Sequence, residues 1–376
     1  MITNMGIMET FDFQPSIRLV FGPNQIDQLG QLTKELAHPS KVLLITDQGV
    51  ATAGILDRAI DALKSMDIDT HIFQEVTPNP TTKDVQNATN LAHKIGNIGL
   101  IVGLGGGSAM DCAKGVNFLL TNGGTMEDYW GFGKATQPML PSIGIPTTAG
   151  TGSEAQSYAL ISQADTHIKM ACGDKKARFR AVILDPVLTE TMPAQVSALT
   201  GFDAISHAIE SYVSTKGNSM SRLFAKSAWQ MLSQNFELAL QPNSDSDVRG
   251  HMLLGANLAG MAIECSMLGA AHACANPLTA KYQITHGLAV SLMLPHVIEL
   301  NSKKVGNLYQ QLSTDLASSI RHFQSVANLP SRLRDTGIPR SGINDLAISA
   351  SEQWTGNFNP VLLTDEVLVQ LYERAY

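Results

Sequence analysis

Cysteine is scarce in this sequence. The 376 residues include four cysteines (Cys112, Cys172, Cys265 and Cys274), and no two of them form a Cys-x-x-Cys pair. A chain of this length buries a large core without disulfide bonds, so this spacing argues against a disulfide framework. We therefore expect reduced thiols and a cytoplasmic protein.

Long runs of basic residues are missing as well. The formal net charge is -7, and no block of five or more lysines and arginines occurs. Nucleic acids and anionic membranes are therefore poor candidates for a partner.

Membrane and secretion signals are also absent from the expected places. The start, MITNMGIMETFDF, lacks the basic and apolar regions of a signal peptide. The most apolar long stretch, residues 252–280, contains Glu264 and His272. We expect a buried helix pair there and no membrane span.

The first half of the sequence contains a regular alternation of apolar runs and helical patterns. Short runs rich in β-branched and aliphatic residues predict strands at 41–46, 69–76 and 141–148, and residues 97–108 predict a strand followed by a glycine loop. Helical patterns occupy 55–66, 82–95 and 108–119. This alternation predicts a Rossmann-like α/β domain, a parallel sheet with helices on both faces.

After about residue 190 the strand signals fade. Helical patterns dominate at 195–213, 220–240, 246–264, 308–327 and 343–351. We predict an α/β plus all-α chain, with an α/β domain at 1–190 and an all-helical domain at 191–376.

Two loops of small residues follow predicted strands. GLGGGSAMDCAKG (residues 103–115) continues into a helix, and PTTAGTGSEA (146–155) holds four hydroxyls and two glycines. The first loop is neither a Walker A loop nor a strict dinucleotide fingerprint, because Ser108 takes the place of the third glycine. Glycines at a helix N-terminus nevertheless suit a phosphate, and two such loops at strand ends predict a ligand at that edge of the sheet.

Asp47 directly follows the first predicted strand. A carboxylate there can bind ribose hydroxyls and repel a 2′-phosphate, or it can cap the following helix. The sequence alone leaves both interpretations open.

The residues GFDAISHAIESYVS (201–214) place Asp203 and His207 four positions apart on one helical face. Alone, this pair favours an intrahelical contact. His272 and His286, however, stand in an apolar stretch with no acidic residue between them. If each begins or ends a helix, they can meet Asp203 and His207 in a four-ligand site for Fe(II), Zn(II) or another divalent metal.

Several longer motifs resemble one known family. They are PNPT (78–81), GGGSAMDCAKG, PTTAGTGSEA, ILDP, MPAQVSALTGFDAISHAIESYVS and GAAHACANPLTAKYQITHGLAVSLMLPHVIELN. The chain resembles the iron-containing (group III) alcohol dehydrogenases from its FGP (21–23) to its closing LYERAY.

The resemblance implies an N-terminal dinucleotide-binding domain and a C-terminal metal-binding helical domain, the architecture also seen in dehydroquinate synthase. It implies four metal ligands: Asp203, His207, His272 and His286. It implies cofactor contacts from Asp47, Asn79, Gly105, Gly106, Gly107, Ser108, Asp111, Thr147, Thr148, Thr151, Lys169 and Leu188. Asp47 matches the aspartate of NAD-preferring members, so we expect NAD in preference to NADP.

One position departs from the family pattern. Members often read His-Ala-x-Ala-His-Pro, whereas this chain reads HACANPL and carries Asn276 at the second histidine. The family histidine is assigned to the active site as a possible proton carrier. An asparagine forms hydrogen bonds but does not titrate, so the proton must leave by another route or the chemistry must differ.

The expected reaction is reversible hydride transfer between a small alcohol and NAD, with the metal polarising the alcohol or carbonyl oxygen. No G-x-S-x-G elbow is present, and this mechanism needs none. Residues 250–280 contain no lysine or arginine, which favours a neutral alcohol or aldehyde as the substrate. Candidate pocket walls, each of which could also be plain core, are Tyr158, Phe202, Ile263 and Phe358.

Two alternatives share the domain plan. A dehydroquinate synthase-like lyase would need several basic residues around its substrate, and a degenerate nucleotide-binding relative would not need an intact ligand set. A homodimer is expected from the resemblance alone.

Overall fold

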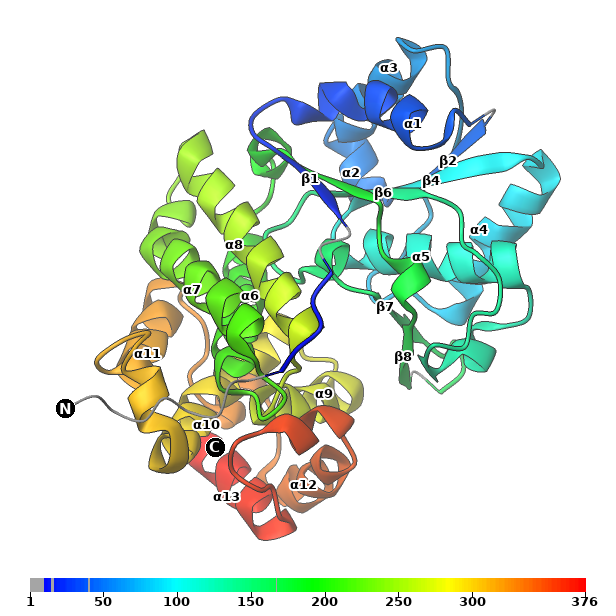
Figure 1. The fold of residues 1–376 in the computed structure, drawn as a ribbon. Coiled ribbons are helices and arrows are strands. Elements are labelled where there is room, and N and C mark those ends of the chain that lie inside the picture. The colour runs from blue at the N-terminus through cyan, green and yellow to red at the C-terminus, as the bar shows by residue number, and fades with distance from the viewer. Residues whose placement is uncertain (1–9, 15–16, 40, 167) are drawn as a thin grey trace. The chain divides into compact units, whose positions relative to one another are not determined.

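The computed structural model describes residues 10–14, 17–39, 41–166 and 168–376 (Figure 1). The prediction about a signal peptide concerned the first 13 residues, of which 1–9 lie outside the described residues. The chain divides into two compact units. The α/β unit comprises Ile17–Ser197 and Gln241–Asn257; the helical unit comprises Ala198–Leu240 and Leu258–Tyr376, with residues 10–14.

The α/β unit is built on a six-stranded sheet. Its strands are β1 (Arg18–Phe21), β2 (Lys41–Ile45), β3 (Asp69–Phe73), β4 (Ile98–Gly105), β6 (Ser142–Pro146) and β9 (Ala181–Leu184). They are ordered β1-β9-β6-β4-β2-β3, and every neighbouring pair is parallel. The central strands are buried on both faces, which explains their continuous apolar runs. The predicted parallel sheet is confirmed.

Helices cover both faces of this sheet (Figure 1). They are α1 (Leu29–Ala37), α2 (Gln48–Thr52), α3 (Ile55–Lys64), α4 (Thr82–Ile95) and α5 (Gly107–Asn122). In α3, Leu56, Ala59 and Leu63 recur at helical spacing and pack with α1 into a shared core against the sheet. Thr81 and Asp84 form a capping box that fixes the start of α4.

A second, three-stranded sheet was not predicted. It consists of β5 (Gly131–Phe132), β8 (Lys169–Gly173) and β7 (Tyr158–Ser162), with β7 and β8 antiparallel. Strands β1 and β9 of the large sheet were also missed, and the strand predicted at 69–76 ends at Phe73.

The remaining helices are α6 (Ala194–Val213), α7 (Ser219–Ala239), α8 (Ser246–Cys265), α9 (Ala270–Tyr282), α10 (His286–Tyr309), α11 (Leu316–Val326), α12 (Ile343–Ser351) and α13 (Asp365–Ala375). Short 3-10 turns join elements throughout the described chain: η1 (Gln25–Gln28), η2 (Met126–Tyr129), η3 (Ser153–Ala155), η4 (Lys175–Ala177), η5 (Pro186–Thr189), η6 (Leu333–Thr336), η7 (Arg340–Gly342) and η8 (Trp354–Phe358). The helical character of the second half is confirmed.

The continuous helix predicted at 308–327 is wrong. Helix α10 ends at Tyr309, and α11 begins at Leu316. Asp315 accepts a hydrogen bond from the Ser318 N–H and so starts a new helix, because a cap satisfies the free N–H groups of a first turn.

No single helix in the described part of the chain is long and apolar enough to cross a membrane. Helices α8 and α9 pass that test together by length and composition only, and they are bent by 105°. In α9 most side chains of the first nine residues, including His272, are buried in the protein, in agreement with the predicted buried pair.

Candidate functional site

The first glycine loop lies at the carboxyl end of β4 and leads into α5. Gly105 has φ of +147°, and a Cβ there would lie 2.8 Å from the Cβ of Ala109 and 3.0 Å from Oδ2 of Asp47. A Cβ on Gly107 would lie 2.7 Å from Thr151. These two positions therefore require glycine, and the loop leads directly into the N-terminus of α5, whose first N–H groups have no partners within the helix.

The predicted cofactor residues gather around this loop from several strand ends. The N–H of Asn79 donates to Oγ of Ser108 (3.2 Å), and the N–H of Thr147 donates to the carbonyl of Gly105 (2.9 Å). Thr148 faces Gly106, 3.5 Å from an added Cβ. The two loops thus adjoin at the carboxyl edge of the parallel sheet, where α/β folds bind their ligands.

Asp47 is seen in the second of its two predicted roles. It is the N-cap of α2, and its Oδ1 accepts a hydrogen bond from the N–H of Val50 at 3.0 Å. Its Oδ2 points toward Gly105. One carboxylate oxygen therefore holds the helix, and the other faces the glycine loop.

Three other predicted cofactor residues have different surroundings. Lys169 is exposed on β8, whereas Leu188 is 2% exposed within η5. Asp111 is buried in α5, and its Oδ1 accepts a hydrogen bond from Oγ of Ser153 at 2.6 Å. Burial raises the pKa of Asp111 because it disfavours the charged carboxylate.

Lys114, which the sequence interpretation did not single out, completes this cluster. It is 1% exposed, and its Nζ donates to the carbonyls of Ser153 (2.6 Å) and Tyr158 (2.6 Å) and to Oγ of Ser153 (2.9 Å). The ammonium thereby ties α5, which follows the first loop, to the end of the second loop.

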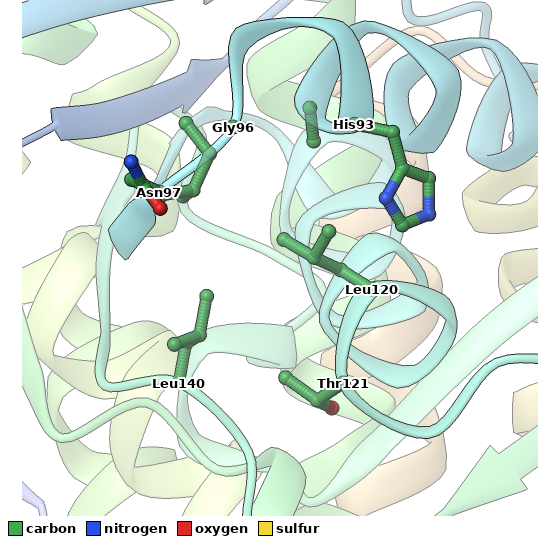
Figure 2. A pocket seen from close by; sticks show the side chains of 8 residues that line it. His93, Gly96, Asn97, Leu120, Thr121 and Leu140 are labelled. Atoms are coloured by element: carbon green, nitrogen blue, oxygen red, sulfur yellow. The ribbon is translucent and has the colours of Figure 1, made fainter.

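A cavity of about 240 Å³ lies at the other end of β4 (Figure 2). It is lined by the last turns of α4 and α5 and by the segments that enter β4 and β6: Ala92, His93, Gly96, Asn97, Ile98, Leu120, Thr121 and Leu140. It opens at the amino edge of the sheet, opposite the glycine loops, and contains none of the predicted site residues.

The four predicted metal ligands converge within the helical unit. Oδ1 of Asp203 lies close to the Nε2 atoms of three histidines: His207 at 3.2 Å, His272 at 3.5 Å and His286 at 3.5 Å. Asp203 and His207 share one face of α6, and the other two histidines lie in the first turns of α9 and α10. One ligand atom each from Asp203, His207 and His272 fall within 4.8 Å of one another, which is a potential metal site.

The donor atoms of this cluster suit a divalent cation. Oδ1 of Asp203 and Nε2 of His272 are buried and have no hydrogen-bond partner among the described residues. Buried polar atoms without partners are costly, and a carboxylate oxygen with imidazole nitrogens is a common ligand set for iron or zinc. The residues present therefore fit a metal ion.

Charged groups within the cluster shift the pKa values of Asp203 and His272. Burial opposes ionisation of Asp203, but the adjacent His207, His272 and His286 outweigh it and hold the pKa of Asp203 well below its usual range. Burial would lower the pKa of His272, yet the carboxylates of Glu210 and Asp203 raise it to about 9.

Glu210 is the partner that His272 lacks in its own stretch of sequence. Its Oε2 lies 2.5 Å from Nδ1 of His272, and its Oε1 accepts a hydrogen bond from the N–H of Ala271 at 2.6 Å. Sequence reasoning noted Glu210 one turn beyond His207 but gave it no role. The spacing of Asp203, His207 and Glu210 on one helical face was the available signal.

Asn276 lies one turn beyond His272 on α9. Its side-chain N–H donates to Oε1 of Gln353 at 3.0 Å, a partner that the sequence did not indicate. Among the candidate pocket walls, Phe202 is fully buried and packs edge-to-face on Phe236 at 5.2 Å.

Comparisons with known proteins agree with this arrangement. A family model described as "Iron-containing alcohol dehydrogenase" matches residues 15–186, and one described as "Fe-containing alcohol dehydrogenase family, C-terminal" matches residues 197–376. The chain belongs to the iron-containing alcohol dehydrogenase family, so the predicted resemblance is confirmed.

Individual relatives cover nearly the whole chain. Alcohol dehydrogenase 4 of Schizosaccharomyces pombe is 34% identical over 345 residues, or 89% of this chain and 82% of the relative. A crystal structure of 1,3-propanediol oxidoreductase superposes with a TM-score of 0.93 at 28% identity, covering 98% of this chain and 100% of that one. Sulfoacetaldehyde reductase from Bifidobacterium kashiwanohense in complex with NAD+ superposes with a TM-score of 0.89 at 25% identity, covering 98% and 99%.

These findings support an alcohol/aldehyde oxidoreductase with small-molecule alcohol or aldehyde substrates. The predicted reaction class is confirmed, and the lyase alternative is not favoured.

Proposed function

We propose that this enzyme oxidises a small neutral alcohol, or reduces the matching aldehyde or ketone, with NAD and a divalent metal held by Asp203, His207, His272 and His286. The observation that carries the proposal is the convergence of three Nε2 atoms on one buried carboxylate oxygen. A divalent cation supplies Lewis-acid chemistry at such a site, and NAD supplies the redox chemistry. Iron is the preferred metal because of the family, and zinc is the alternative.

The chain's own residues provide charge and position. Asp203 contributes the negative charge that balances a cation, and the histidines contribute neutral nitrogen donors from three helices. The side-chain amide of Asn276 forms hydrogen bonds, such as the one that it donates to Gln353, but it does not accept or release a proton at neutral pH.

The dinucleotide is proposed to bind at the glycine loops of the α/β unit. The backbone of Gly105, Gly106 and Gly107 and the N-terminus of α5 suit the pyrophosphate, with Ser108, Thr148 and Thr151 nearby. Oδ2 of Asp47 would accept hydrogen bonds from ribose hydroxyls and repel a 2′-phosphate, which supports NAD over NADP. Asn79, Asp111, Thr147, Lys169 and Leu188 are proposed contacts from the resemblance, and the functional boundary is proposed at 190/191.

A neutral substrate is supported by the composition of the sequence around His272. No lysine or arginine occurs from Gly250 to Ala280, and the next basic residue, Lys281, lies 2.9 Å from Asp345 at the surface. A phosphate or several carboxylates on the substrate would need a cationic partner.

The direct test combines metal analysis with turnover. Purified protein loaded with Fe(II) or Zn(II) is expected to oxidise NADH with a panel of small aldehydes, and chelation is expected to abolish this activity. Metal and NAD binding with no turnover of any aldehyde would favour the lyase, and an absence of metal binding would favour the degenerate relative.

Two further properties are proposed from the resemblance and composition. A homodimer is tested by light scattering of the purified protein. A cytoplasmic location agrees with four free cysteines, and fractionation of the source cells tests it.

A further inference from the structure

Both oxygens of Glu210 are committed to the first turn of α9. The residue is 4% exposed on α6. Oε1 receives the N–H of Ala271, and Oε2 receives Nδ1 of His272. Because an ionised carboxylate only accepts hydrogen bonds, Nδ1 must carry the imidazole proton.

This arrangement determines the chemistry of the opposite ring nitrogen. When a metal takes the place of a proton on this ring, the remaining proton stays on Nδ1 and Nε2 of His272 presents its lone pair. That Nε2 atom is the buried one near Asp203 that has no hydrogen-bond partner among the described residues. Nδ1 of His207 is likewise without a partner there, so His207 has no equivalent support.

We propose that Glu210 is a positioning residue that fixes the ring orientation and tautomer of His272 for metal binding, while anchoring the N-terminus of α9. The inference rests on the proposed metal site. Metal-ligating histidines generally donate their second N–H to a carboxylate or carbonyl, and loss of that partner typically weakens metal binding about 10–100-fold.

A second anchor of the same helix allows the two roles of Glu210 to be separated. Oδ1 of Asn359 accepts the N–H of Ala270 at 3.3 Å and a side-chain N–H of Asn301 at 2.9 Å. Asn359 therefore supports the start of α9 and has no hydrogen bond to His272 among those described. Asn359→Ala is a matched control for helix anchoring.

The test variant is Glu210→Gln, which keeps the size of the side chain but has one acceptor oxygen where two donors must be met. If that oxygen stays on the Ala271 N–H, the amide NH₂ donates to Nδ1 and moves the ring proton to Nε2. The Zn(II) dissociation constant, measured by competition with a chelator, should then rise about 10–100-fold. The visible spectrum of the Co(II)-loaded variant should differ from that of the wild type.

Asn359→Ala should lower the unfolding midpoint but leave the Zn(II) dissociation constant within about threefold of the wild type, well short of the loss expected for a missing histidine partner. An unchanged dissociation constant in Glu210→Gln, or an equal loss in both variants, would overturn the inference. A wild-type protein that binds no Zn(II) would instead defeat the proposed function. Should Glu210→Gln fail to fold, long-range ¹H–¹⁵N spectra of the Zn(II)-loaded wild type decide: a proton on Nδ1 of His272 supports the inference, and an Nδ1 without a proton overturns it.

Discussion

Lys114 in the α/β unit and Asp203 in the helical unit are both charged and buried, but their surroundings differ. Nζ of Lys114 donates to two carbonyls and a hydroxyl at 2.6–2.9 Å. Oδ1 of Asp203 faces three Nε2 atoms and makes no hydrogen bond among the described residues. A buried charge whose hydrogen bonds are all satisfied stabilises the fold. Buried metal-ligating atoms that converge on one point without hydrogen-bonding to one another indicate a missing ligand.

The largest loss of stability is expected at Lys114, whose hydrogen bonds are satisfied. Lys114→Met should lower the free energy of unfolding of the α/β unit by about 3–5 kcal/mol, because it leaves the buried carbonyls of Ser153 and Tyr158 without their donor and removes the ion pair between Nζ and Oδ1 of Asp111 (3.8 Å). Urea denaturation measures this loss. Metal affinity should be unchanged, since the ligands lie in the other unit; a loss below about 1 kcal/mol would show that the ammonium is not essential there.

At the Asp203 cluster, substitution should mainly affect the binding of the metal. Asp203→Asn keeps the size of the side chain but removes its charge, and should weaken Zn(II) binding by more than about 100-fold, beyond the loss typical of a supporting residue. Isothermal calorimetry measures the change. An affinity near that of the wild type would mean that the cation binds elsewhere.

Metal removal should lower stability only while the centre is intact. A ligand held at about 100 times its dissociation constant stabilises a protein by about 2.7 kcal/mol. Chelation should therefore lower the thermal midpoint of the metal-loaded wild type by several degrees. Asp203→Asn should show no such shift, and an equal shift in both proteins would contradict the assignment.

The smallest effect is expected at Asn276. Loss of its single neutral hydrogen bond to Gln353 should cost about 0.5–1.5 kcal/mol of stability in Asn276→Ala. Asn276→His should add an ionisation near pH 6.5 to the pH profile of kcat, because the native amide does not titrate. A pH profile of kcat that is the same in Asn276→His as in the wild type would contradict that interpretation.

The elements that local sequence could predict are those with a strong local pattern. The buried strands β2, β4 and β6 are continuous apolar runs, and the start of α4 is marked by the capping residues Thr81 and Asp84. Strands β7 (YALIS) and β8 (KMACG) were missed although they are as long as β2, because they contain alanines and polar end residues and lack the run of valine, leucine and isoleucine seen in β2. The break between α10 and α11 depends on a single cap at Asp315, which a periodic pattern obscures.

The residues of the site also fall into two groups, those with a local sequence signal and those brought together only by tertiary packing. The spacing of Asp203 and His207 indicates a shared helical face, but the approach of His272 and His286 depends on how three helices pack. Glu210 meets His272 across 62 positions of sequence, and Lys114 meets Ser153 across 39. Such tertiary pairs leave no periodic signal, so the structure was needed to find them.

The most direct measurement is anomalous diffraction from a crystal of the protein grown with Fe(II) or Zn(II). We expect one strong peak at the absorption edge of the added metal, within bonding distance of Asp203 Oδ1 and the Nε2 atoms of His207, His272 and His286. A fully loaded protein with its peak elsewhere, or with the three imidazoles turned away from it, would contradict the account.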